Sequence, residues 1–184
     1  MYWPDKHVFT IDIPKTACVT RWRIGKAMHG RRILPGHRKM SEAIVELEEL
    51  GIDVENIEFW TVIRNPAKRL VSACNYHYAQ LYKATTPGPD LYSYLKQIQE
   101  SKYADSAVFR SQSSWLDSNY DVKLWPMEHY DEMIRALGWE GPIKRENESH
   151  KTWATEELVE SPYYNNFMDK YASDWDLYHK ALNK

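Results

Sequence analysis

KHVFTIDIPKTACVT, residues 6–20, is the segment around which the rest of this chain is organised. The run Val8–Ile11 is rich in β-branched and aromatic residues, which predicts a buried strand. Pro14 ends that strand, and the residues from Lys15 onward turn into a helix that carries Trp22. At such a junction the unpaired N–H groups of the first helical turn and the positive end of the helix dipole face the same point. The sequence therefore predicts an anion site between the strand and the helix.

Side chains in the turn add to this predicted site. Lys15 supplies a mobile positive charge, and the hydroxyls of Thr16 and Thr20 supply further donors. The expected ligand is a phosphate or a sulfate. The turn is not a Walker A loop, because that motif needs glycines and residues 12–20 contain none. The alternative interpretation is an ordinary strand–turn–helix unit whose lysine is solvated.

A second strand with a similar ending follows later in the chain. The run Ile57–Ile63, IEFWTVI, is nearly continuous in apolar residues, as expected for a strand covered on both faces. Arg64 follows it in a position to bind a phosphate with its forked guanidinium, and Pro66 suits the first turn of a helix that should run to about Tyr82. Ser72 lies on that helix, roughly 9 Å along the axis from Pro66. Taken singly, Arg64 also suits a surface ion pair, and Ser72 a small packing residue.

The rest of the chain alternates between helices and strands. We expect a short strand over Arg31–Pro35, a helix over Glu42–Leu50 with Ser41 as its N-cap, a helix from Asp90 to about Ser101, a strand over Val122–Trp125, a helix over Met127–Leu137 and helical pieces over Thr155–Leu182. This alternation predicts an α/β fold of three layers, with a central, mostly parallel sheet flanked by helices. Because ligands of such sheets gather at the C-terminal ends of the strands, the turns after the two long strands should lie close together.

Length and composition favour one folded domain over residues 1–184. Apolar residues make up 43% and charged residues 27%, which is typical of a chain with a core, and the net charge of −2 gives no sign of a nucleic-acid partner. Positive charge is nevertheless concentrated, because residues 13–41 hold eight Lys or Arg and no Asp or Glu. This window surrounds the predicted anion site and indicates a local positive field.

Cys18 and Cys74 provide neither the spacing of a metal site nor a disulfide framework, which favours a reducing compartment. The chain shows no signal peptide and no apolar run near 18 residues. We therefore expect a cytoplasmic protein with no membrane span.

Together, IPKTACVT at 13–20 and TVIRNPAKRLVSA at 61–73 resemble the two signature motifs of the carbohydrate sulfotransferases that use 3′-phosphoadenosine 5′-phosphosulfate (PAPS). In that family the first motif is close to IPKTGGTS and binds the 5′-phosphosulfate, and the second is close to RNPxxRLVSAY and binds the 3′-phosphate. The resemblance implies a P-loop-like fold and transfer of a sulfuryl group from PAPS to a hydroxyl of an acceptor, with a glycan as the expected class. It implies adenosine 3′,5′-bisphosphate as the product, and no metal.

The resemblance also gives each matching residue a role. It places the 5′-phosphosulfate against Lys15, Thr16, Ala17, Cys18, Val19 and Thr20, and the 3′-phosphate against Arg64 and Ser72. Lys15 is also implied to be catalytic, because negative charge builds on the leaving oxygen during transfer. The chain departs from the motif where Ala17 and Cys18 replace two glycines and Val19 replaces a threonine, which makes a close approach of the backbone to the ligand harder.

Weaker similarities extend the resemblance over most of the chain. His37 corresponds to a histidine proposed in the family as the base that deprotonates the acceptor, and an unperturbed pKa of about 6.5 suits that role. His29 is the reserve candidate. Gln112–Leu116 resembles a segment near the acceptor. A late polar loop that closes over the nucleotide is represented here by Ser149, Lys151 and Thr152.

Two other functions fit parts of the pattern. A P-loop kinase for a small molecule would also hold phosphates at such turns, but it would use a glycine-rich loop and a magnesium-binding aspartate. A non-catalytic nucleotide-binding module of the same fold would explain the altered residues Ala17, Cys18 and Val19.

Overall fold

The computed structural model describes residues 1–29, 37–82, 88–144, 152–162 and 164–183. Within them lie the strands β1 (Tyr2–Trp3), β2 (Val8–Ile11), β3 (Glu58–Ile63) and β4 (Val122–Pro126). The α-helices are α1 (Cys18–His29), α2 (Met40–Glu49), α3 (Pro66–Tyr82), α4 (Leu91–Gln99), α5 (Tyr130–Ala136), α6 (Thr155–Val159), α7 (Tyr164–Met168) and α8 (Ala172–Leu182). Short 3₁₀ turns occupy Pro4–Lys6, Val54–Asn56, Ser113–Trp115, Met127–His129 and Asp169–Tyr171.

The described strands form one open sheet in the order β1-β2-β3-β4. β1 pairs antiparallel with β2, whereas β2, β3 and β4 run parallel, with Phe9 opposite Phe59 and Phe59 opposite Val122. Every residue of β2 is buried, as predicted for a strand covered on both sides. The expected α/β class and mostly parallel sheet are confirmed, and the chain adds the short antiparallel strand β1, which the sequence analysis did not predict.

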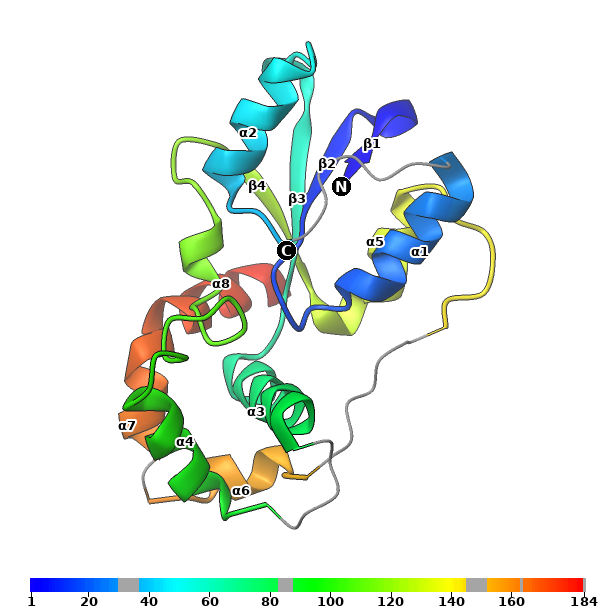
Figure 1. Cartoon of the computed structure of the whole chain (residues 1–184). Coiled ribbons are helices and arrows are strands. Elements are labelled where there is room, and N and C mark those ends of the chain that lie inside the picture. The colour runs from blue at the N-terminus through cyan, green and yellow to red at the C-terminus, as the bar shows by residue number, and fades with distance from the viewer. Residues whose placement is uncertain (30–36, 83–87, 145–151, 163, 184) are drawn as a thin grey trace.

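Helices cover both faces of the sheet (Figure 1). Side chains of α1 and α5, such as Ile24 and Met133, pack on the face that carries Val8 and Val62. Side chains of α2 and α8 pack on the opposite face, around Phe9, Ile11 and Phe59. This arrangement gives the three predicted layers.

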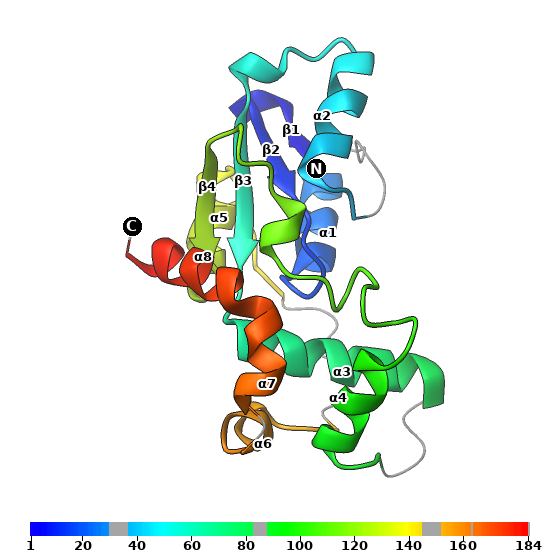
Figure 2. The ribbon, with the colours of Figure 1, turned by 90° about the vertical axis from the view of Figure 1, so that its left-hand side faces the viewer.

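The helices α3, α4, α6 and α7 form a separate cluster beyond the carboxyl end of β3 (Figure 2). Their shared core includes Leu70 and Tyr78 of α3, Tyr94 and Leu95 of α4 and Leu158 of α6. The second predicted turn, Arg64–Asn65, joins β3 to α3, and the first contacts α3 where Arg69 donates to the Pro14 carbonyl, so both turns lie between the sheet and this cluster. None of the helices in the described ranges combines the length and the apolar character that a membrane crossing requires.

Several predicted boundaries can now be compared with the structure. α3 has the predicted bounds, and the Asp90 side chain caps α4 by accepting a hydrogen bond from the Ser93 N–H at 2.9 Å. The prediction for Ser41 is wrong, because α2 begins at Met40, two residues before the predicted start at Glu42, and Lys39 is its N-cap. There the Lys39 N–H donates to the Glu42 carboxylate at 3.0 Å, while Met40 is fully buried and anchors the helix in the core.

Other differences are smaller. The predicted helix over 127–137 is a 3₁₀ turn followed by α5, and Gly138, at φ 95°, follows it as predicted. The C-terminal helical stretch is divided as expected between α6 and α7, near Pro162. The predicted strand over Arg31–Pro35 lies outside the described residues.

Candidate functional site

The turn between β2 and α1 has an unusual backbone. Lys15 adopts φ 71° and Ala17 adopts φ 60°, both in the left-handed region that favours glycine. Such a conformation costs an L-residue roughly 1–2 kcal/mol. Two strained residues in one turn that carries the predicted anion-binding lysine are a reason to assign function to this turn, since strain of this kind concentrates at ligand sites.

The first turn of α1 presents backbone donors beside Lys15. The Arg21 N–H donates to the Ala17 carbonyl at 3.2 Å and is the first bond of the helical ladder. The N–H groups of Cys18, Val19 and Thr20 therefore precede that ladder, as in any helix start. No acidic residue lies in this first turn, so the positive end of the helix dipole is not offset there.

The side chains of Thr16 and Cys18 hold the turn together. The Thr16 hydroxyl and the Cys18 thiol each donate to the Ile13 carbonyl at 2.8 Å. Burial and the nearby Asp12 carboxylate raise the pKa of Cys18 to about 11, so the thiol is neutral at physiological pH. Because both side chains already donate to Ile13, these two residues would bind an anion through their backbone N–H groups. The Thr20 hydroxyl donates to the Lys144 carbonyl at 3.4 Å.

The second predicted turn meets the first. Arg64 follows β3, and its guanidinium Nη1 donates to the Lys15 carbonyl oxygen at 3.1 Å. Gln112 fixes the backbone of Arg64, because its amide oxygen accepts from the Arg64 N–H and its amide nitrogen donates to the Arg64 carbonyl, both at 2.9 Å. The two residues that the sequence analysis assigned to opposite ends of one nucleotide are thus in direct contact.

Buried polar residues that the sequence analysis did not single out support this contact. The Asp174 carboxylate, on α8, accepts from the Gln112 and Ser113 N–H groups at 2.8 and 2.9 Å. Arg69, on α3, donates to the Pro14 carbonyl at 3.1 Å and to the Arg110 carbonyl at 2.9 Å. Because Arg69 is buried and its guanidinium is bonded to the backbone of both segments, it holds them in a fixed position relative to α3.

Positive charges crowd together at the junction. Burial, and to a smaller extent the nearby Arg64 guanidinium, lower the pKa of Lys15 to about 8. Burial also lowers the pKa of Arg64, which Glu128 partly opposes. The Lys15 ammonium lies 4.4 Å from the centroid of the Tyr76 ring, on α3. Burial deprives both cations of hydrating water. A bound anion would stabilise their charged forms, because it supplies a negative charge close to them.

His37 lies at the start of this region. Its Nδ1 is 2.6 Å from the Asp12 carbonyl oxygen, and its ring centroid is 5.4 Å from that of Trp22 and 6.1 Å from that of Trp115. A carbonyl oxygen only accepts, so Nδ1 carries the proton and the lone pair of the neutral ring is on Nε2. The geometry thereby selects the tautomer in which Nε2 has the basic lone pair.

Asp12 itself anchors the turn to α1. Although burial opposes ionisation, the N-terminal ammonium and Arg21 lower the pKa of the Asp12 carboxyl. The Arg21 Nε donates to this carboxylate at 2.9 Å, and the Trp22 indole N–H donates to it as well. His37, which binds the Asp12 carbonyl, is therefore connected to the same buried ion pair.

The remaining predicted residues are distributed along α3 and a late segment. Ser72 is partly exposed on α3, one turn before Tyr76 and therefore on the same helix face. The Thr152 and Trp153 N–H groups both donate to the Asn75 side-chain oxygen at 2.9 Å, which attaches the late segment to α3. Ser149 and Lys151 lie outside the described residues, and so does the side chain of His29.

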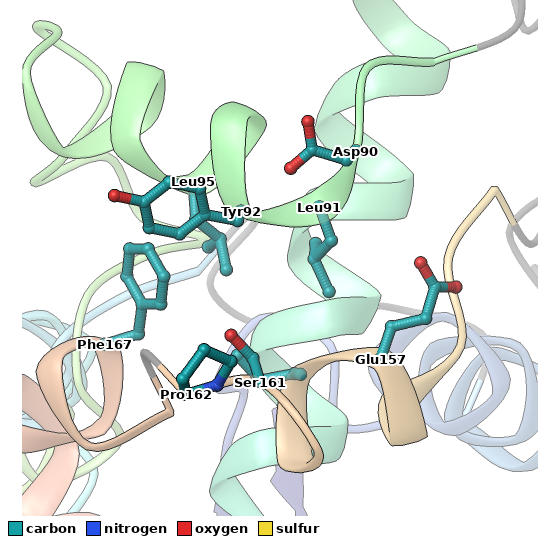
Figure 3. A pocket seen from close by; sticks show the side chains of 9 residues that line it. Asp90, Leu91, Tyr92, Leu95, Glu157, Ser161, Pro162 and Phe167 are labelled. Atoms are coloured by element: carbon teal, nitrogen blue, oxygen red, sulfur yellow. The ribbon is translucent and has the colours of Figure 1, made fainter.

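A pocket of about 310 Å³ lies elsewhere in the helical cluster. Figure 3 shows it between α4, with Tyr92 and Leu95, and the α6–α7 segment, with Pro162 and Phe167. None of the predicted site residues lines it. Among the described residues, His, Cys, Asp and Glu side chains form no group of three or more that could hold a metal ion.

Comparisons of the chain with protein-family models, with curated proteins and with solved structures found no match. The function must therefore be argued from the site itself.

Proposed function

We propose that the protein is a PAPS-dependent sulfotransferase that transfers a sulfuryl group to a hydroxyl of an acceptor, with a carbohydrate as the acceptor class. The single observation that supports this most strongly is the 3.1 Å hydrogen bond between the Arg64 guanidinium and the Lys15 carbonyl. It joins the two turns whose sequences resemble the 5′- and 3′-phosphate motifs of that family. A P-loop-like arrangement of the sheet and its turns is part of the same proposal.

The donor would lie across the junction of the two turns. Lys15, the backbone of 16–18 and the start of α1 would hold its 5′-phosphosulfate end. Arg64 and Ser72 would hold its 3′-phosphate, and Thr152 is placed near α3 to help close the site. The left-handed residues Lys15 and Ala17 give the turn the shape in which successive N–H groups approach one anion.

The chain's own residues then have separable roles in transfer. PAPS supplies the activated sulfuryl group, and adenosine 3′,5′-bisphosphate leaves. The Lys15 ammonium stabilises negative charge on the leaving 5′-phosphate oxygen, as a preorganised donor does. His37 accepts the acceptor hydroxyl's proton on Nε2 while Nδ1–H stays bonded to the Asp12 carbonyl. Gln112 and Asp174 keep Arg64 in place.

Incubation of the purified protein with sulfur-35 PAPS over a glycan array tests the proposal. The expected result is labelled product that requires a hydroxyl-bearing acceptor and does not require Mg²⁺. Binding of adenosine 3′,5′-bisphosphate without transfer to any acceptor would instead support a non-catalytic module. Magnesium-dependent phosphate transfer from ATP would support a kinase, and either outcome would overturn the sulfotransferase proposal.

A further inference from the structure

We propose that Tyr76 is a positioning residue that holds the Lys15 ammonium at the mouth of the phosphate-binding turn and keeps it charged until an anion arrives. The role in transfer rests on the proposed function, but the interaction itself belongs to the ligand-free protein and can be tested without any nucleotide.

Both the backbone and the side-chain ammonium of Lys15 have contacts that fix their positions. Its carbonyl oxygen accepts from Arg64 at 3.1 Å, and its ammonium lies 4.4 Å from the centroid of the Tyr76 ring. The lysine side chain has four rotatable bonds, so its position in solution would otherwise be spread over many rotamers. Contact with the Tyr76 ring limits the number of side-chain rotamers. It also places the ammonium, which belongs to the turn after β2, beside α3, the helix that carries Ser72.

Tyr76 is well placed for contact with a ligand as well as with Lys15. It is 40% exposed, so part of its ring remains accessible to a ligand. Ser72 lies one helical turn before it, on the same face. The Tyr76 ring therefore lies beside the Lys15 ammonium and on the helix face that also carries Ser72.

Two features of the surroundings of Lys15 oppose its positive charge. Arg64, at the end of β3, repels the ammonium, and burial removes its water. Cys18, at the start of α1, is a neutral thiol with a pKa of about 11 at this position and offers little compensation at neutral pH. The negative face of the Tyr76 ring, from α3, lies against the ammonium and favours its charged form. When a phosphate or sulfate binds, it replaces the ring as the partner of the ammonium.

The test measures the pKa of Lys15 in the free protein by competitive acylation with acetic anhydride across pH 6–11. Peptide mass spectrometry reads the extent of labelling, and Lys68, an exposed lysine of α3, serves as the internal reference. Tyr76→Phe keeps the aromatic face and Tyr76→Leu removes it. Tyr82→Leu is the matched control, because Tyr82 lies on the same helix and is 43% exposed.

We expect Tyr76→Leu to lower the pKa of Lys15 by about 0.5–1.5 units, the range that corresponds to a cation–π contact. Tyr76→Phe and Tyr82→Leu should leave it within about 0.3 units of the parent value. For a shift of one unit, the affinity for inorganic pyrophosphate at pH 8 should fall about fivefold in Tyr76→Leu, since less of the lysine is charged.

An unchanged Lys15 pKa in Tyr76→Leu, or an equal shift in Tyr82→Leu, would overturn the proposal. Either result is separable from failure of the proposed function, because a protein with the expected pKa shifts and no affinity for adenosine 3′,5′-bisphosphate would contradict the sulfotransferase proposal alone.

Discussion

Replacement of Lys15 by methionine should stabilise the protein while abolishing anion binding. Methionine keeps most of the length and apolar volume of the lysine stem but cannot be charged. The pKa of Lys15 is lowered from 10.5 to about 8, because folding buries the ammonium and brings it close to Arg64. The unfolded chain therefore holds this proton up to a higher pH than the folded protein does, and the charged lysine reduces the free energy of unfolding at neutral pH.

The magnitude follows from that difference. A shift from 10.5 to about 8 corresponds to a ceiling of roughly 3 kcal/mol at pH 7, at about 1.4 kcal/mol per pKa unit. The contact of the ammonium with Tyr76 is already part of the folded-state pKa, so nothing more is subtracted, and the expected gain for Lys15→Met is up to roughly 3 kcal/mol. Because the parent protein loses the penalty as the pH rises from 8 toward 10.5, the gain should fall to about half by pH 9.5.

Urea unfolding at pH 7 and pH 9.5, followed by circular dichroism, measures both quantities. Lys68→Met is the matched control, because Lys68 is exposed on α3 and its replacement should leave the stability nearly unchanged at both pH values. If Lys15→Met destabilises the protein at pH 7, or if its effect does not depend on pH, then the charged Lys15 ammonium does not lower the stability of the folded protein.

Two further substitutions test the shape of the turn and the role of the histidine. Ala17→Gly should raise the free energy of unfolding by about 0.5–1 kcal/mol, because relief of the left-handed strain at φ 60° exceeds the backbone entropy of glycine; a loss of stability in urea unfolding would show that the turn is not strained. His37→Ala should lower kcat by about 10²–10⁴ with calorimetric affinity for adenosine 3′,5′-bisphosphate unchanged, and full activity of this variant across pH 6–8 would assign the base elsewhere.

Local sequence signals predicted the two central strands and the helix between Pro66 and Tyr82, because each depends on neighbouring residues. An apolar, β-branched run suffices for a buried strand, and a proline at the first helical position suffices for a helix start. The prediction of Ser41 as N-cap was wrong for a reason of tertiary structure, since Met40 is buried in the core and α2 begins there, two residues before the predicted start. The strand β1 is only two residues long, too short to show any periodicity.

The sequence predicted that Lys15 and Arg64 lie close together, but it did not predict the hydrogen bonds that hold them there. Lys15 and Arg64 follow strands, and parallel strands bring their carboxyl ends together, so their proximity could be inferred. The hydrogen bonds of Gln112 and Asp174 join segments far apart in the sequence, and a single sequence holds no signal for such pairs. The contact of Lys15 with Tyr76 was missed for the same reason.

We propose that one doubly phosphorylated adenosine bridges Lys15 and Arg64. Calorimetric titration of the parent and of Arg64→Ala with adenosine 3′,5′-bisphosphate and with adenosine 5′-phosphate tests this binding mode. We expect the parent to prefer the bisphosphate, and Arg64→Ala to weaken its binding by about 10- to 100-fold, the range for a charge-assisted contact, while the affinity for adenosine 5′-phosphate changes little. Equal losses of affinity for the two nucleotides, or a parent that does not distinguish between them, would rule out such a bridge.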